Sequence, residues 1–591
     1  MSALRVSEHH LRRPCDRCRQ RKSRCIKEPG KENCAFCNLN NVTCTFLHGP
    51  RPRIKVRSPP SVTETKPTRH SSPTSSTAGS NDEKDAAGPI NSRLEGTLGL
   101  ELHLHSEYVG PASYHDPELL DLRHSAVSFA EHEVFYPRRV NQSTAFITYP
   151  DKKSASEVQR IDDLDRIEGA IRPFGPPLVN LYFRIIHRTF PILDKGVFLE
   201  KYARSYREFS PPLLAAVYLI ALDWKLFDRT LATAPQPPNV DALKDLSMRA
   251  MFDDLKRPKL STLQAGLLLM QRILPSHSTL PAQLLSIGQT VGIHLDCSDW
   301  KIPEWEKGLR RRLAWALYMQ DKWGVLVHGR PSLINDQVGE DGGPSDWDVR
   351  DCTLEDFTEE GPGENQSGDG EVDAASGQAA FLQSIKLTKI YSRIISTFYS
   401  VGATKRGGLL DRIGPSGAMT LAKPLAIELH EWHAAVPPSL RLESSTSLRL
   451  STSGALHLSH MAVELTIHRA LLRTLTTNTA PSLRSTIRTA AHARLKSAIS
   501  LIESFQPEHI QSFWGFAAAA QVALVGTFAG LLWATSAEME EATGYVEQLE
   551  KLRWILQLRA PAVPFAREAL RMLHEEVGDL AVVKAATLQG S

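Results

Sequence analysis

The chain has 591 residues, of which 42% are hydrophobic, so disorder throughout is excluded and more than one folded unit is expected. The net charge of +3 is unevenly distributed, because residues 1–60 contain fourteen Lys or Arg against four Asp or Glu, which leaves −7 for the rest. A cationic N-terminal segment on an acidic remainder predicts a polyanionic partner for that segment alone. The N-terminus has no apolar signal segment, and we expect a reducing compartment, cytosolic or nuclear.

Six of the eight cysteines lie within thirty residues and repeat one spacing. The pattern C-x2-C-x6-C occurs twice, which gives six candidate metal ligands: Cys15, Cys18, Cys25, Cys34, Cys37 and Cys44. One tetrahedral zinc would take the two C-x2-C pairs and leave Cys25 and Cys44 unexplained. Two zinc ions need eight coordination positions, which six thiolates fill only if two of them bridge. The simplest assignment is a cofactor of two zinc ions bridged by Cys15 and Cys34.

The segment between Cys18 and Cys25 carries four cations in six positions and predicts a short helix with a cationic face. A Lys or Arg on a rigid element can meet both acceptors of a guanine edge in the major groove. The basic tail after Cys44, interrupted by Pro52, suits phosphate contacts or a nuclear import signal. The predicted DNA-binding residues are Arg19, Arg21, Lys22, Arg24, Arg51 and Arg53.

The stretch RPCDRCRQRKSRC…NCAFCNLNNVTC resembles the binuclear zinc cluster of fungal transcription factors at every cysteine spacing. The resemblance implies two zinc ions bridged by Cys15 and Cys34 and recognition of CGG-like triplets. It also implies base contact centred on Lys22, with Arg19 and Arg21 near phosphate. The alternative is a zinc-stapled protein-interaction module whose positive charge is incidental.

The composition changes along the chain predict a mostly α protein with a small zinc-stapled head, a disordered linker and a large all-helical regulatory body. Residues 58–89 contain one aliphatic side chain larger than alanine, Val62, which is typical of a tether. Gly96 and Gly99 interrupt any heptad pattern, so no coiled coil is expected after the head. The predicted boundaries are 1–57 for the head with its basic tail, 58–130 for the linker, 131–338 for the helical middle region, 339–378 for an acidic loop and 379–591 for the C-terminal helical part.

Apolar residues recur at helical spacing through the body. The clearest predicted helices cover residues 178–186, 213–222, 263–273 and 304–329. The last has Leu309, Leu313, Ala316 and Leu317 facing inward, with the arginine run 310–312 alongside, and it is expected to stop at Gly329-Arg330-Pro331.

Three stretches of the body, LVNLYFRIIHRTFPILDKGVFLEKY, LLSIGQTVGIHLDCSDW and RRRLAWALYMQDKWGVLVHGRPS, are similar to the fungal-specific middle homology region. YMQDKWGVLVHGRPS and SFWGFAAAAQVALVGTFAGLLWATSA look most similar to nitrogen-pathway activators of the TamA type. That resemblance implies control of nitrogen-source catabolic genes, together with a partner factor.

Two segments allow two interpretations each. Residues 510–537 carry no formal charge, but acidic rather than basic residues follow them, so a buried helix, or two with a break, is favoured over a membrane span. Residues 340–373 hold thirteen acidic groups around Trp347, Leu354 and Phe357. This composition suits either a transcriptional activation element or a solvated loop.

Enzymatic motifs are absent from the sequence: there is no HExxH pair, nucleophile elbow, Walker loop or dinucleotide loop. His430 and His433 share a helix face, and we expect them to be structural or exposed histidines. Cys297 and Cys352 are isolated, which favours core packing over redox sensing.

These features predict a nuclear, zinc-dependent regulator of RNA polymerase II genes that is not an enzyme and that binds double-stranded DNA in a sequence-specific way. A homodimer, or a complex with a partner transcription factor, is expected to form through the helical body, and no membrane association is expected. The alternative is a promoter-recruited coactivator or scaffold that acts mainly through its body.

Overall fold

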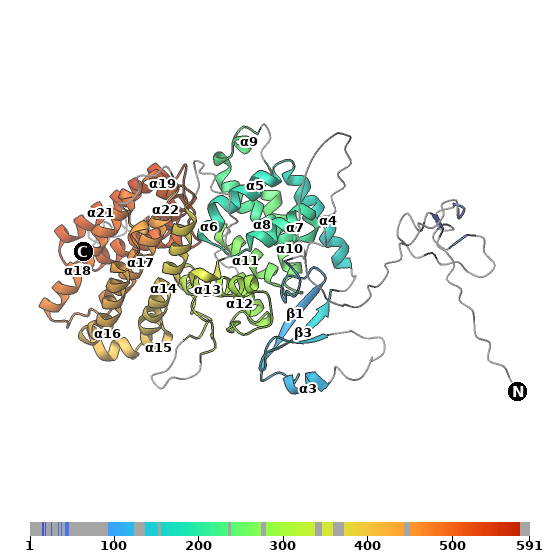
Figure 1. Ribbon diagram of the computed structural model, residues 1–591. Helices are drawn as coiled ribbons and strands as arrows, with labels where there is room; N and C mark the ends of the chain where they lie inside the picture. Colours follow the sequence, from blue (N-terminus) through green and yellow to red (C-terminus); the bar gives the residue numbers. More distant parts are fainter. Residues whose placement is uncertain are drawn as a thin grey trace, which may run out of the picture. The chain divides into compact units, whose positions relative to one another are not determined.

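The computed structural model describes residues 15, 16, 18, 25, 33, 34, 37, 42–45, 93–122, 136–151, 155–234, 238–272, 279–336, 345–357, 372–442 and 449–578. The chain divides into two compact units, Met1–Gly88 and Pro89–Ser591. The first contains the head, and we refer to the second as the body (Figure 1).

A small antiparallel sheet lies near the start of the body. Its strands are β1 (Leu104–Val109), β2 (Tyr136–Arg139) and β3 (Ala145–Pro150), in the order β1-β3-β2, and the short helix α3 (Pro117–Leu122) lies between β1 and β2 in the sequence. In the central strand, Phe146 is fully buried and its ring packs edge-on against Trp300, with the centroids 5.3 Å apart. The sheet therefore has a hydrophobic contact with the helical part of the body.

The sheet corrects two sequence-based predictions. The linker was expected to reach residue 130, but Leu104 pairs with Pro150 and Val109 with Ala145 across β1 and β3, so the body begins earlier. The mostly α class is confirmed, but the body is not all-helical. The reason is visible in β3, which is buried at four consecutive positions instead of alternating ones and so lacks the period-two pattern of a half-buried strand.

Helices α4 to α13 build a first hydrophobic core. Their bounds are α4 Ala155–Ile171, α5 Gly175–Leu181, α6 His187–Thr189, α7 Lys195–Arg204, α8 Pro211–Ala221, α9 Arg229–Ala232, α10 Val240–Asp254, α11 Leu260–Arg272, α12 Leu280–Thr290 and α13 Glu304–His328. A π-helical turn, Tyr182–Ile186, joins α5 to α6. The four helices predicted from apolar spacing are all present, as α5 with this turn, α8, α11 and α13.

Helix α13 ends as its sequence predicts. Gly329 adopts a left-handed φ of +65°, and its amide donates to the carbonyl of Val325 at 3.0 Å. Glycine reaches this conformation without the steric cost that a Cβ would add. The four residues expected to face inward, Leu309, Leu313, Ala316 and Leu317, are all at most 1% exposed.

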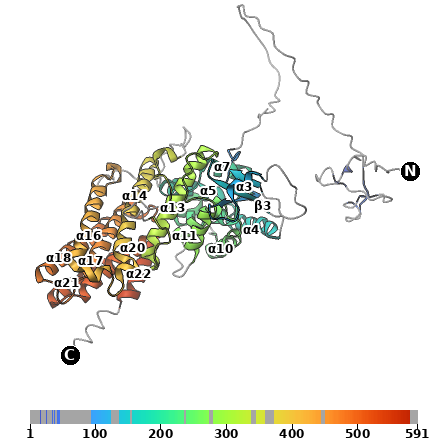
Figure 2. The same cartoon turned by 90° about the horizontal axis from the view of Figure 1, so that it is seen from below.

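The helices from α14 onward form a second core. Their bounds are α14 Ala374–Tyr399, α15 Val401–Thr404, α16 Leu409–Ala434, α17 Ser453–Arg473, α18 Pro481–Ser504, α19 Pro507–Ile510, α20 Ala518–Ala534, α21 Met539–Arg559 and α22 Pro564–Val577. Figures 1 and 2 show these helices grouped on one side of the body and α4 to α12 on the other.

Helices α13 and α14 contribute to both cores and form the seam between them. On α13, Leu309 belongs to the first core and Trp323 to the second, and on α14 the same holds for Phe381 and Tyr391. The rings of Trp323 and Tyr391 stack with centroids 4.4 Å apart. The two halves are thus joined through continuous helices as well as through packing.

Glu306, at the start of α13, holds the N-terminal segment of the body. Its carboxylate is fully buried and accepts hydrogen bonds from Arg310 Nε at 2.9 Å, from Thr97 Oγ1 at 2.7 Å and from the amide of Leu98 at 2.9 Å. A buried carboxylate is tolerated only when its charge and its lone pairs are satisfied in this way. The contact fixes the chain just before β1.

The next two arginines of α13 are buried against other distant segments. Arg311 forms an ion pair with Asp356, and Arg312 donates through Nη1 to the carbonyls of Pro191 at 2.5 Å and Leu193 at 3.1 Å. Both arginines are less than 9% exposed. The sequence places this run beside the apolar face of α13, and the structure shows that it is part of the interior.

The predicted acidic loop, residues 339–378, is packed at both of its described ends. Trp347 and Phe357 are buried in the first core, and Asp356 is only 4% exposed. Asp373 caps α14 by accepting from the amide of Ser376 at 2.9 Å. The described parts of this segment are therefore anchored to the body at Trp347, Asp356 and Phe357, whereas Leu354 is exposed. Residues 339–344 and 358–371 lie outside the described residues, and a role in activation stays a prediction.

The uncharged segment 510–537 contains the end of α19, a break, and α20, whose residues are largely buried in the second core. The preferred interpretation, a buried helix after a break, is confirmed. Within the ranges that the structure describes, no helix has the length and apolar character needed to cross a membrane.

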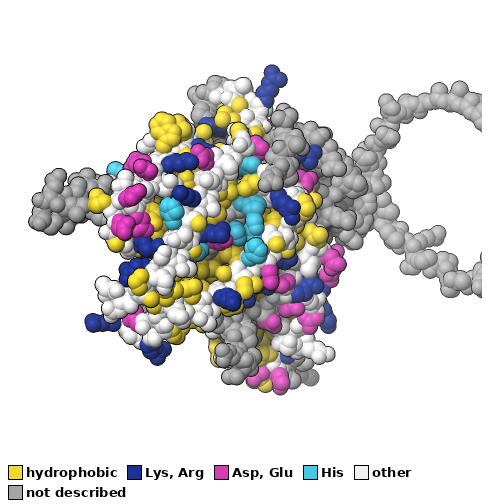
Figure 3. All heavy atoms as spheres, turned by 90° about the vertical axis from the view of Figure 1, so that its left-hand side faces the viewer, with side chains coloured by type: hydrophobic (Ala, Val, Ile, Leu, Met, Phe, Trp, Pro, Cys, Tyr) yellow, Lys and Arg dark blue, Asp and Glu magenta, His cyan; other side chains and the backbone are white. Residues whose placement is uncertain are grey.

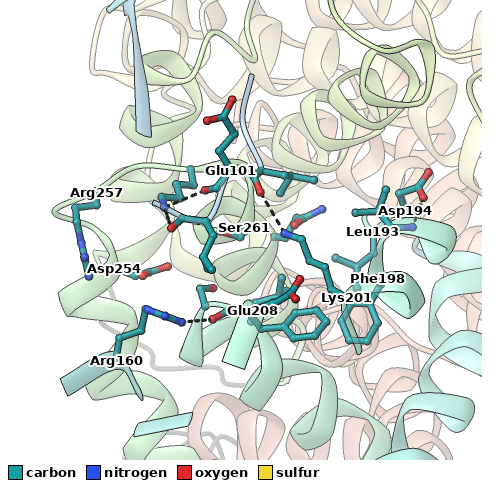
Figure 4. A pocket seen from close by; sticks show the side chains of 18 of the residues that line it. Glu101, Arg160, Leu193, Asp194, Phe198, Lys201, Glu208, Asp254, Arg257 and Ser261 are labelled. Atoms are coloured by element: carbon teal, nitrogen blue, oxygen red, sulfur yellow. Dashed lines mark hydrogen bonds between the residues drawn. The ribbon is translucent and has the colours of Figure 1, made fainter. Parts of the chain in front are cut away.

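A cavity with charged walls lies beside the segment that leads into β1 (Figure 4). Lys259 Nζ donates to the carbonyls of Glu101 at 3.1 Å and Leu102 at 2.8 Å and to Asp151 Oδ2 at 2.6 Å. These three contacts use all three ammonium protons. Lys259 thus anchors the segment of the body that leads into β1.

Asp254 at the end of α10 lines the same cavity. Thr262 Oγ1 donates to its Oδ2 at 3.1 Å, and burial raises the pKa of the carboxyl to about 6. Burial also lowers the pKa of Lys201, across the cavity, to about 8. Both shifts follow from the cost of placing a charge where water is excluded.

The ion pair between Arg311 and Asp356 leads to a first prediction. Asp356→Ala leaves the buried guanidinium of Arg311 without its ion-pair partner, and we expect the free energy of unfolding to fall by about 3–5 kcal/mol. Chemical denaturation followed by tryptophan fluorescence measures this change. Glu355→Ala, at the exposed neighbouring position, is the matched control and should change the stability by less than about 0.5 kcal/mol. Equal effects of the two variants would contradict the structural role of the pair.

The raised pKa of Asp254 leads to a second prediction. Between about pH 4 and pH 6 the folded chain holds this proton more tightly than the unfolded chain, so the contribution of Asp254 to stability falls as the pH rises. Asp254→Asn removes this dependence. Its stability relative to the wild type should therefore rise by about 2–3 kcal/mol from pH 4 to pH 7. The exposed Asp253→Asn is the control, and a pH-independent difference for Asp254→Asn would show that the carboxyl titrates normally.

Candidate metal centre and nucleic-acid interface

Four cysteines of the N-terminal unit converge. The sulfurs of Cys15, Cys18, Cys34 and Cys37 all lie within 4.8 Å of one another, and all four residues are fully buried. Cys15 Sγ is 4.0 Å from Cys34 Sγ and 3.7 Å from Cys37 Sγ, and Cys18 Sγ is 3.6 Å from Cys34 Sγ. The two repeats of the sequence are therefore brought together through their C-x2-C pairs.

The backbone reproduces the sequence repeat. The amide of Cys15 donates to Cys25 Sγ at 3.5 Å, and the amide of Cys34 donates to Cys44 Sγ at 3.1 Å, so the first cysteine of each unit contacts the third. Cys25 and Cys44 are half-buried and pack against the four central cysteines. The six sulfurs thus form one cluster with internal pseudo-symmetry.

The electrostatics of the cluster favour thiolates at equivalent positions of the two units. Burial opposes ionisation of Cys34, but the backbone hydrogen bond from Cys37 and bonds from neighbouring thiols outweigh it and lower its pKa to about 6. The pKa of Cys15 is also lowered, against the effect of burial, by the backbone hydrogen bond from Cys18 and by neighbouring thiols. Thiolates are the form that binds metal.

These distances fit zinc. A Zn–S bond of about 2.3 Å in a tetrahedral site separates two ligand sulfurs by about 3.8 Å. The three measured separations, 3.6, 3.7 and 4.0 Å, bracket that value. A unit this small has little apolar surface to bury, so metal binding would supply its folding free energy.

The sequence did not identify Asn33 as part of this centre. Its Oδ1 accepts a hydrogen bond from the amide of Cys44 at 2.8 Å and so links the start of the second repeat to its end. A bond between the amide of Asp16 and the carbonyl of Thr45 at 2.8 Å joins the first repeat to the second. An asparagine directly before C-x2-C is the only signal for the first contact, and the sequence carries none for the second.

The predicted DNA-binding side chains were all assigned to the cationic segment and the basic tail. Arg19, Arg21, Lys22, Arg24, Arg51 and Arg53 lie outside the described residues. Cys18 and Cys25, which flank the cationic segment, are described, and Cys18 is among the four buried cysteines that could hold a metal ion. The segment thus begins and ends at cysteines of the cluster.

Histidines gather with apolar side chains in a hollow on the face of the body formed by C-terminal helices (Figure 3). The ring of His433 stacks on His460 with centroids 4.5 Å apart and meets His457 edge-on at 5.6 Å. Burial lowers the pKa of His460 to about 3, so its ring is neutral at pH 7. Among the described residues, the group suited to a metal ion is formed by the four buried cysteines.

Comparisons with known proteins agree with both parts of the chain. A family model described as "Fungal Zn(2)-Cys(6) binuclear cluster domain" matches residues 13–54, and one described as "Fungal specific transcription factor domain" matches residues 179–433. The first family holds two zinc ions on six cysteines, which is the predicted cofactor.

Two curated relatives are similar over most of the chain. Transcriptional activator protein DAL81 of Saccharomyces cerevisiae is 31% identical over 79% of this chain and 51% of its own length. The uncharacterized transcriptional regulatory protein C25B8.11 of Schizosaccharomyces pombe is 28% identical over 67% of this chain and 65% of its own length. This chain therefore spans about half of the first relative and about two thirds of the second. With its six-cysteine cluster and its helical body, the chain belongs to the fungal binuclear zinc cluster proteins that carry a fungal specific transcription factor domain.

Proposed function

We propose that this protein is a nuclear, sequence-specific DNA-binding regulator of RNA polymerase II genes. The observation that carries the proposal is the cysteine cluster, whose sulfur separations fit tetrahedral zinc and whose cysteines enclose four cations in six positions. A small domain that is folded by metal and carries clustered Lys and Arg is typical of nucleic-acid-binding proteins. The two matched domains are those of transcription factors, which supports a regulatory and not an enzymatic role.

Within the cluster, we assign Cys15 and Cys34 as the bridging ligands. Each has its sulfur within 4 Å of a cysteine from the other repeat, Cys15 near Cys37 and Cys34 near Cys18. Each also contacts the third cysteine of its own repeat through its amide. Each bridging sulfur would then bind both zinc ions, and the second and third cysteines of each repeat would be terminal ligands.

DNA recognition is assigned to the cationic segment. Lys22 would meet the guanine acceptors of a CGG-like triplet, with Arg19, Arg21 and Arg24 close to the same groove. Arg51 and Arg53 in the basic tail would contact phosphates, adding affinity without sequence information. The phosphate contacts set the position of the head, and Lys22 supplies the preference.

The body would decide whether transcription follows. A role in activation is supported by the name of the relative that covers most of this chain, a transcriptional activator protein. Control of nitrogen or other catabolic genes rests on the resemblance of YMQDKWGVLVHGRPS to TamA-type activators. Contact with a second copy or with a partner transcription factor is assigned to the body, because the sequence after the head lacks a sustained heptad pattern.

A second candidate function, a promoter-recruited coactivator, is favoured by the division of the chain into two separate compact units. In that case the body alone would locate the promoter. Genome-wide occupancy of a Cys34 variant separates the two functions, because loss of occupancy supports direct reading of DNA and retained occupancy supports recruitment.

The bridging assignment predicts the zinc content of cysteine variants. The wild type should hold two zinc ions per chain. Cys34→Ser should lose both ions because each site loses a shared ligand, whereas Cys44→Ser should keep about one. Elemental analysis of the purified protein measures the ratio. Cys297→Ser, at a buried cysteine outside the cluster, is the control and should keep both ions. Equal losses from Cys34→Ser and Cys44→Ser would contradict the bridging role.

The assigned roles of Lys22 and Arg53 predict different effects on DNA binding. Lys22→Ala should cost about 1–3 kcal/mol on DNA with a CGG triplet and much less on random DNA. Arg53→Ala should weaken binding to both DNAs alike and reduce the salt slope by about one. Fluorescence anisotropy titrations at several salt concentrations measure both effects. The assignment of Lys22 fails if its replacement weakens specific and random DNA equally.

A further inference from the structure

A cavity at the seam between the two cores differs from the charged cavity near β1. We call it the seam cavity; it has a volume of about 140 Å³ and is lined by residues of both halves of the body. Phe190 and Phe513 of the first core and Trp323 and Phe516 of the second contribute to its walls. The rings of Phe190 and Phe513 are stacked with centroids 6.1 Å apart. Flat aromatic faces therefore form much of the lining.

The lining of the seam cavity contains no charged side chain and no histidine among the residues that the structure describes. The charged cavity, by contrast, is lined by several Asp, Glu, Lys and Arg residues, some of which bind the chain's own backbone (Figure 4). An ion entering the seam cavity would lose its hydration without meeting a counter-charge, which is costly. The seam cavity thus selects for uncharged molecules.

Three groups across the seam fix the orientation of a buried amide. The backbone amide of Phe516 donates to Gln271 Oε1 at 3.1 Å, which places the other end of the Gln271 amide toward Gln320. Gln271 Nε2 donates to Gln320 Oε1 at 3.3 Å. Gln320, on α13, therefore has its Oε1 engaged, and its Nε2 has no hydrogen-bond partner within the described part of the chain. Gln320 is only 2% exposed. A buried donor without an acceptor costs about 1–3 kcal/mol.

Two hydroxyls that line the seam cavity are also buried without a hydrogen-bond partner. Thr189 Oγ1 and Thr452 Oγ1 are buried and have no partner among the residues described, and Thr452 is 3% exposed. A neighbouring polar pair is satisfied, because Gln521 Nε2 donates to Ser459 Oγ at 3.0 Å. The unsatisfied groups are thus a specific set, one amide donor and two hydroxyls, and each such group in a folded protein calls for an explanation.

We propose that the seam cavity binds an uncharged, flat small molecule that carries a hydrogen-bond acceptor, of the class of aromatic carboxamides and nitrogen heterocycles. Its acceptor takes one of the two free protons of Gln320 Nε2, its polar edge meets the threonine hydroxyls, and its flat face packs on the aromatic walls. At about 10–15 Å³ for each water-sized volume, the cavity holds a molecule of about ten non-hydrogen atoms.

The position of the site gives the ligand a regulatory role that is separate from DNA reading by the head. The ligand would touch side chains of both cores at once, so its binding would stabilise the packing of the two halves that the structure shows. Any molecule that binds the folded state and not the unfolded state also raises the unfolding temperature. Ligand binding at this site can therefore be measured as a rise in the unfolding temperature, independently of transcription.

Binding of simple probes to the purified full-length protein tests this proposal. Nicotinamide and benzamide are uncharged carboxamides of nine non-hydrogen atoms each, and nicotinate and benzoate are anions of the same shape and size. Saturation-transfer NMR and thermal unfolding should show binding and stabilisation by the two amides. The two anions should do neither.

Two variants assign the binding to the seam cavity. Gln320→Met keeps the volume and removes the free donor, so it should weaken amide binding about tenfold. In the ligand-free protein the loss of an unsatisfied donor is offset by the loss of the Gln320 Oε1 acceptor, while Gln271 Nε2 keeps its bond to the carbonyl of Leu267 at 3.2 Å, so the unfolding temperature should change little. Thr452→Val, another replacement of similar shape, removes one free hydroxyl and should also weaken binding. Gln283→Met on α12, outside the lining, is the matched control and should leave binding unchanged.

The proposal is overturned if neither amide binds, if the anions bind as well as the amides, or if amide binding is the same in Gln320→Met and in the wild type. Absence of binding would mean that the seam cavity holds water only. The DNA-binding titrations of Lys22→Ala are unaffected by either result, so failure of this site and failure of the proposed function are distinguishable.

Discussion

The body depends on the burial of three consecutive arginines in α13. A guanidinium in the interior must keep its charge and therefore needs acceptors from the protein. Arg310 finds them at Glu306, Arg311 at Asp356, and Arg312 at the carbonyls of residues 191 and 193. Glu306 lies one turn earlier on α13 and also accepts from Thr97 and Leu98. The acceptors of Arg311 and Arg312 come from distant segments, so satisfying one helix brings together the start of the body, an internal loop and part of the acidic segment.

The N-terminal unit follows a different rule. Its centre consists of four buried cysteine sulfurs, and its stability is tied to the free energy of metal binding and so to pH and zinc supply. The body is built instead around two large hydrophobic cores. The two units can therefore gain or lose structure independently, and zinc availability would change DNA reading without unfolding the regulatory part.

The sequence predicted what is local or repeated. The two C-x2-C-x6-C units identified the metal centre, and apolar spacing together with Gly329 identified α13 and its end. The sequence did not predict the features that depend on contacts between residues far apart in the chain. The strands are short and β3 is buried at consecutive positions, Asp356 looks like a solvated acid until Arg311 is placed beside it, and Gln271 and Gln320 belong to one hydrogen-bonded chain only after α11 and α13 pack.

Helix α13 links the point where the body's N-terminal segment is held to the seam between the cores. Glu306, which holds Thr97 and Leu98, and Gln320, which lines the seam cavity, are fourteen residues apart on one continuous helix, or about 21 Å along its axis. A helix of this length transmits displacement as a rigid rod. Any movement of α13 along its axis would therefore be felt at Thr97 and Leu98, so the lining of the seam cavity and the segment that leads into β1 are coupled through one helix.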